Sequence, residues 1–153
     1  MAESLAVVLR EGYSHVEGDL SEEALTLIAS ARASTHLTPD ERSRRLAPIV
    51  AAYRAGPRQL WGPVLLYLLA PAILVRLQRL AARPPVMDKE EIRQQFLVEL
   101  LHLAATVPLP VYGRWPKRTL MSRANQAVRR WLEREGRRQD GQTSWETLEE
   151  EGQ

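Results

Sequence analysis

The residues of this chain best suited to binding chemistry are arginines, and they gather toward its carboxyl end. Residues 114–138 hold eight arginines and one lysine against two glutamates, a net charge of +7 in a chain whose total is +2. A guanidinium group presents a planar fork of N–H donors that matches two phosphate oxygens. Trp115 and Trp131 lie in the same stretch. This pattern predicts a surface that binds a polyanion.

Composition argues against several kinds of catalytic and metal site. The chain has no cysteine, which excludes disulfides, thiolate metal sites and a cysteine nucleophile. His15, His36 and His102 are far apart, and their spacing fits no metal or catalytic set. We find neither a Gly-rich phosphate loop nor a paired, buried set of carboxylates. We therefore expect a protein that is not an enzyme and has no catalytic residue, no metal site and no cofactor.

The arginines fall on one side of a predicted helix over residues 115–135. Pro116 suits its first turn, and Gly136 suits the position after its end. At 100° per residue the apolar face comprises Leu120, Ala124, Ala127, Val128, Trp131 and Leu132. The arginines that occupy or flank the opposite face are Arg118, Arg123, Arg129, Arg130 and Arg134, beside Ser122, Gln126 and Glu133. Trp131 is expected in the core, whereas Trp115 fits either base stacking or a hydrophobic contact at the helix start. The alternative for the whole basic face is an ordinary solvated surface.

Elsewhere, apolar residues recur with the period of a helix, which predicts an all-α, compact helical bundle. Ser21 predicts the start of a helix to about residue 33. Thr38-Pro39 predicts the start of another, which must kink or restart at Pro48. Gly56-Pro57 ends that segment. Two apolar helices should follow, over about 58–69 and 71–82, with Pro71 opening the second.

A further helix, from residue 89 to about 105, is predicted to begin with a capping box at Asp88. We expect it to bury Ile92, Phe96 and Leu100 and to leave Glu91, Gln94, Gln95, Val98 and His102 on its other face. The apolar run 60–75 is shorter than the roughly 20 residues of a membrane helix and contains two prolines, so we expect it in the core. Without a secretion signal or a membrane span, we expect a cytoplasmic protein.

Residues 139–153 carry five acids and no base. They are predicted to be a flexible tail, although both acidic ends of the chain could instead fold over the basic helix and screen it.

From residue 53 onward the order of features resembles region 2 of bacterial sigma factors, especially the small extracytoplasmic-function type. The strings that carry the resemblance are Tyr53-Arg54-Ala55-Gly56 and Ala70-Pro71-Ala72-Ile73, then Asp88-Lys89-Glu90-Glu91-Ile92-Arg93-Gln94-Gln95-Phe96, then Trp115-Pro116 and Asn125-Gln126-Ala127-Val128-Arg129-Arg130. The resemblance implies a core of three to four helices over residues 53–138. Residues 1–52 would form an N-terminal helical extension packed on that core.

The resemblance also implies roles for individual residues. Asp88, Glu91, Gln94 and Gln95 would bind RNA polymerase. Melted, single-stranded promoter DNA would be bound by Tyr112, Trp115, Lys117, Arg118, Arg123, Gln126, Arg129 and Arg130.

The chain departs from the family's pattern at two positions and lacks its second domain. Arg129 stands where the family usually has Asp, and Ala124 stands where it usually has Arg. No promoter-reading helix-turn-helix follows residue 138, so we expect a separate protein to supply that domain. Two other interpretations stay open: a helical protein-interaction module with no role at nucleic acid, and a general nucleic-acid-binding protein with no polymerase partner.

Overall fold

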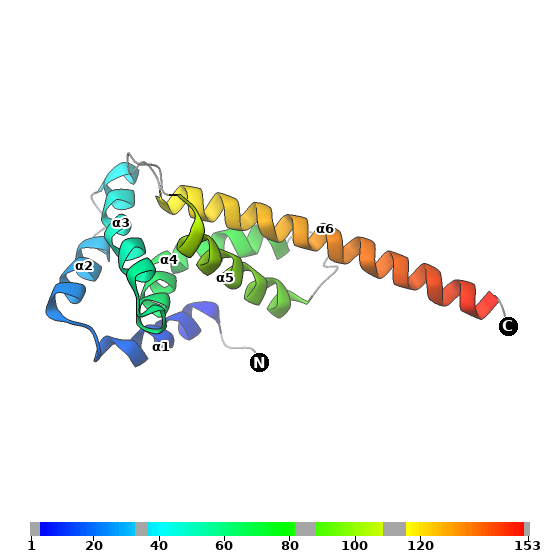
Figure 1. Cartoon of the computed structure of the whole chain (residues 1–153), viewed down its shortest axis with the longest axis horizontal. Helices are drawn as coiled ribbons and strands as arrows, with labels where there is room; N and C mark the ends of the chain where they lie inside the picture. The colour runs from blue at the N-terminus through cyan, green and yellow to red at the C-terminus, as the bar shows by residue number, and fades with distance from the viewer. Residues whose placement is uncertain (1–3, 33–36, 82–87, 109–115, 152–153) are drawn as a thin grey trace.

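The computed structural model describes residues 4–32, 37–81, 88–108 and 116–151, and every regular element in these ranges is a helix. The predicted all-α bundle is therefore confirmed. In chain order the helices are α1 (Leu5–Glu17), α2 (Glu22–Arg32), α3 (Pro39–Ala55), α4 (Arg58–Ala81), α5 (Lys89–Thr106) and α6 (Pro116–Glu151). Figure 1 shows α4 and α5 beside the first half of α6, while the second half of α6 extends away from the bundle.

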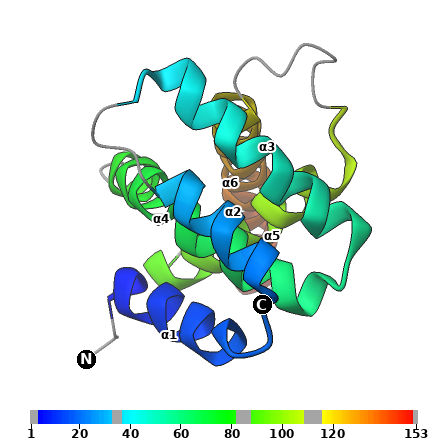
Figure 2. The same ribbon diagram turned by 90° about the vertical axis from the view of Figure 1, so that its left-hand side faces the viewer.

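Helix α4 is the centre of the fold because each of the other five helices packs against it. Its side chains Val64, Leu65, Leu69 and Ile73 are almost completely buried. In the end-on view α3 and α1 lie on opposite sides of the bundle, and α6 runs away behind it (Figure 2). Buried residues of all six helices form one cluster, so a single core holds the chain together.

The amino-terminal helices belong to that core. Leu5 and Leu9 of α1 are buried, and the ring of Tyr13 stacks on that of Tyr67 in α4 with centroids 4.4 Å apart. Burial raises the pKa of Tyr13 above its ordinary value of 10.0, with the nearby negative charge of Glu17 as a second cause. The sigma resemblance separates an N-terminal extension from the core between residues 52 and 53, and that position falls inside α3.

The helix starts predicted at Ser21 and Thr38 are confirmed, whereas the start of α1, which Ser4 caps in the same way, was not predicted. Ser21 Oγ accepts a hydrogen bond from the Ala24 amide at 3.1 Å, and Thr38 Oγ1 accepts one from Glu41 at 3.3 Å. Gly56 ends α3 with a φ of 86°, a conformation that favours glycine. Asp88 occupies the N-cap position of α5, but its side chain accepts no capping hydrogen bond, so the predicted capping box was wrong.

Two predicted helix boundaries, at Pro71 and Gly136, were wrong, and α3 does not restart at Pro48. Helix α3 continues through Pro48, and α4 continues through Pro71, as it does through Pro63, where packing in the core offsets the cost of an interior proline. An interior proline costs a helix roughly 3 kcal/mol, whereas burying one Leu or Ile side chain returns about 1.5–3 kcal/mol. Helix α6 likewise runs past Gly136 to Glu151. Its acidic end therefore continues away from the basic half instead of folding back on it (Figure 1).

Two arginine side chains tie α3 to its neighbours. The Arg54 guanidinium donates from Nε to the Ala104 carbonyl at 2.7 Å and from Nη2 to the Val107 carbonyl, which satisfies acceptors at the end of α5. Arg45 donates to the Ser30 carbonyl at 3.0 Å near the end of α2.

Within the described ranges, α4 is the one helix that is long and apolar enough to cross a bilayer. The core helix of a soluble bundle has the same composition; the other five helices pack against α4, and 39% of this apolar span is buried.

Candidate nucleic-acid interface

Helix α6 is held on the bundle by the apolar side that the sequence predicted. Leu120, Ala124 and Val128 are fully buried, and Met121 is nearly so. Trp131 is half-buried and packs against the core, as expected. Because this side faces α3, α4 and α5, the orientation of the whole basic half of the helix is fixed.

The arginines of α6 remain on the surface. The exposed set is Arg118, Arg123, Arg129, Arg130, Arg134, Arg137 and Arg138. Arg138 makes a long, exposed contact of 3.8 Å with Glu135, which contributes little. Among the side chains that the structure describes, the other six form no ion pair or hydrogen bond, so their guanidinium donors are free for a ligand.

The predicted DNA-binding residues do not form one compact cluster. Arg123, Gln126, Arg129 and Arg130 are exposed along the middle of α6. Lys117 lies about 18 Å before Arg129, at a helical rise of roughly 1.5 Å per residue. It is half-buried beside α3, and burial followed by the positive charge of Arg42 lowers its pKa.

Two predicted residues, Tyr112 and Trp115, lie outside the described residues. Asn125, in the string that carries the sigma resemblance, is buried and so is not available to a ligand.

The predicted polymerase-binding residues share the polar side of α5. Asp88, Glu91 and Gln94 are exposed and Gln95 is half-buried. The side-chain amides are held by neighbouring glutamates: Gln94 donates to Glu90 at 3.4 Å, and Gln95 donates to Glu99 at 3.0 Å.

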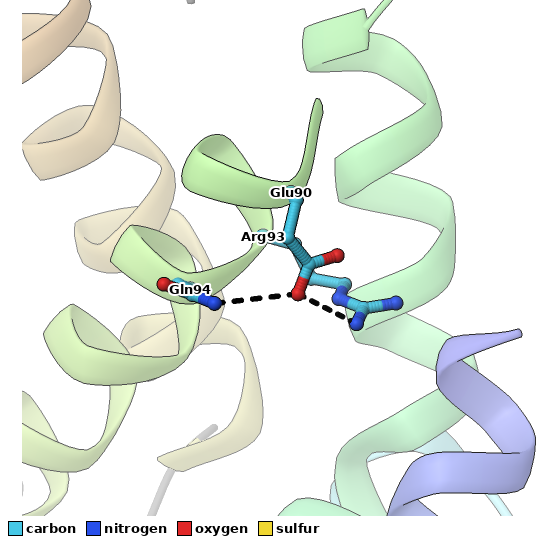
Figure 3. A network of polar contacts seen from close by, with 3 residues as sticks. All are labelled: Glu90, Arg93 and Gln94. Carbon is cyan, nitrogen blue, oxygen red and sulfur yellow. Dashed lines mark hydrogen bonds and ion pairs between the residues drawn. The ribbon is translucent and has the colours of Figure 1, made fainter. Parts of the chain in front are cut away.

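The Glu90 carboxylate also accepts a hydrogen bond from Arg93 at 2.7 Å, so one carboxylate binds two side chains near the start of α5 (Figure 3). The opposite side of α5 buries Ile92, Phe96 and Leu100, as predicted.

Sequence reasoning missed three basic residues outside α6. Arg42 of α3, with Arg76 and Arg79 of α4, lies at one cavity together with Lys117 and Arg118. These residues are far apart in the chain, and only the packing of α3 and α4 on α6 brings them together. The i, i+3 spacing of Arg76 and Arg79, which places both on one side of a helix, was the available signal.

Comparisons of the chain with protein-family models, with curated proteins and with solved structures found no match.

Proposed function

We propose that this chain is a non-enzymatic, cytoplasmic protein that binds the phosphate backbone of single-stranded or melted DNA through the basic side of α6. The observation that carries the proposal is the row of exposed arginines between Arg118 and Arg137, which have no acidic partner among the described side chains. Each arginine that meets a phosphate releases condensed counterions, which makes such a row favourable for nucleic acid.

The rigid attachment of α6 supports this proposal further. Its apolar side is buried in the core, so the arginines stand on a helix whose position is already set. A preformed surface loses less conformational entropy on binding than a mobile chain does.

We also propose a role in transcription, which rests on the sequence strings shared with sigma region 2. It is compatible with the exposed positions of Asp88, at the N-cap of α5, and of Glu91 and Gln94 within α5, which we propose bind RNA polymerase.

One observation favours a second candidate, a helical protein-interaction module. Val98 is 61% exposed on the polar side of α5, and the second half of α6 extends beyond the bundle (Figure 1). An apolar side chain left in water and an unpacked helix are both typical of surfaces that another protein covers.

The first test is fluorescence anisotropy with a labelled single strand and its duplex. Arg129→Ala/Arg130→Ala should weaken binding of the single strand by about tenfold or more, since charge-assisted hydrogen bonds contribute roughly 1.5–3 kcal/mol each. The matched control is Arg44→Ala/Arg58→Ala, which removes two exposed arginines outside α6 and should have little effect. Equal losses in both variants, or no binding at low salt, would reject the α6 surface.

A polymerase pulldown tests the α5 surface separately. Glu91→Ala/Gln94→Ala should abolish capture of RNA polymerase and leave oligonucleotide affinity unchanged. Failure of the wild-type chain to capture polymerase, with DNA binding intact, would leave a general nucleic-acid-binding protein.

A further inference from the structure

A cavity of about 400 Å³ lies between α3, α4 and the first turns of α6. Five cationic side chains line it: Arg42, Arg76, Arg79, Lys117 and Arg118. Among the described residues no acidic side chain lines it. Its volume falls in the range of about 300–1,000 Å³ that small-molecule sites occupy.

The cations gather here without compensation. In the part of the chain that the structure describes, none of the five forms an ion pair or a hydrogen bond. Lys117 illustrates the consequence, since burial and the neighbouring charge of Arg42 both disfavour its protonated form. Repulsion of this kind is relieved when an anion occupies the space between the charges.

Ser43 also lies in the wall of this cavity. The residue is 2% exposed, and its hydroxyl oxygen is buried without a hydrogen-bond partner. Because protein atoms cover this oxygen, an anion in the cavity would meet the cationic side chains and not the hydroxyl.

The remaining wall of the cavity is apolar. Ala72 and Val75 come from α4, and Met121 comes from α6. Inorganic phosphate has no apolar group that would contact this wall, whereas a base or a sugar would pack against it. The amino-terminal turn of α6 adds the positive end of a helix dipole on the side of Lys117.

We propose that this cavity binds a nucleoside polyphosphate. The phosphates would contact the cationic side chains, and the nucleoside would lie against Ala72, Val75 and Met121. Arg118 belongs both to this site and to the row of arginines on α6, but the other residues of the cavity lie outside that row, so the inference does not require that the row binds DNA.

Isothermal titration calorimetry on the full chain without divalent cations tests the proposal, with ATP and GTP as probes. Tripolyphosphate and adenosine report on the two halves of the ligand. Either nucleotide should bind at one site, more tightly than tripolyphosphate, and adenosine should bind much more weakly. Arg76→Gln/Arg79→Gln should weaken nucleotide binding at least about tenfold.

The control Arg44→Gln/Arg58→Gln removes the same charge at two exposed positions outside both the cavity and the arginine row of α6, and should leave nucleotide affinity unchanged. Circular dichroism of each variant separates loss of binding from loss of folding. The proposal is overturned if neither nucleotide binds. It is also overturned if the control weakens binding equally, or if tripolyphosphate binds as tightly as ATP and GTP.

An oligonucleotide arm distinguishes the source of the phosphate. If a single strand displaces the nucleotide and Arg76→Gln/Arg79→Gln reduces its affinity tenfold, the cavity belongs to the nucleic-acid surface and the nucleotide proposal is wrong. If DNA binding depends on Arg129 and Arg130 alone, the two sites are distinct.

Discussion

Pro71→Ala should stabilise the protein, and the size of the effect follows from the path of α4. Pro71 lies in the interior of a 24-residue helix and is exposed. Its ring removes the hydrogen bond to the carbonyl of Tyr67 and crowds that carbonyl, at a cost of about 3 kcal/mol. Proline also restricts the unfolded chain, and the substitution forfeits up to about 1 kcal/mol of that benefit. The expected net gain is about 2 kcal/mol.

Urea unfolding followed by circular dichroism measures this gain as a higher midpoint with an unchanged slope. The matched control is Pro39→Ala, at the first position of α3, where no intrahelical bond is lost. That variant should be neutral or destabilised by at most about 1 kcal/mol. If Pro71→Ala behaves like the control, Pro71 opens a second helix, and the account of α4 as one continuous core helix is refuted.

Three further predictions concern the core, ionisation and helix α6. Phe96→Ala should cost about 3–5 kcal/mol in thermal or urea unfolding because Phe96 is fully buried, whereas Val98→Ala, at an exposed position of the same helix, should change little. The pKa of Tyr13 in the folded protein is raised above 10.0, so the stability that this residue contributes is present below that pH and is lost as pH rises further. Tyr13→Phe should therefore flatten the decline of the free energy of unfolding above pH 10. An equal decline in both proteins would contradict a raised pKa for Tyr13. Gly141→Ala should increase helix content and stabilise α6 by roughly 0.5–1 kcal/mol, since a Cβ there meets no atom within 4 Å; unchanged ellipticity would contradict a helix through that position.

The sequence was sufficient to predict the helices wherever apolar periodicity and capping residues agreed. The buried sides of α5 and α6 follow directly from the 3.6-residue period, and Ser21 and Thr38 marked helix starts through local hydrogen bonds. Pro71 and Gly136 were misread as boundaries because their local preferences compete with burial and helix propagation that depend on the rest of the molecule.

The exposed arginines of α6 could also be predicted, because a basic side opposite an apolar side has to face water. The cavity could not be predicted from the sequence. Arg42 and Lys117 become neighbours only when α3 packs on α6, and the unpartnered hydroxyl of Ser43 is a property of that packing. No spacing along a single helix encodes such a contact.

The most direct test of the central proposal is the salt dependence of single-strand binding for the wild type and Arg129→Ala/Arg130→Ala. For single strands the logarithm of the binding constant falls with the logarithm of salt concentration by about 0.7 per phosphate contact. If both arginines contact phosphates, the variant's slope should be shallower by about 1.4. Parallel lines for the two proteins would show that these arginines make no phosphate contact, and would contradict DNA binding through the basic side of α6.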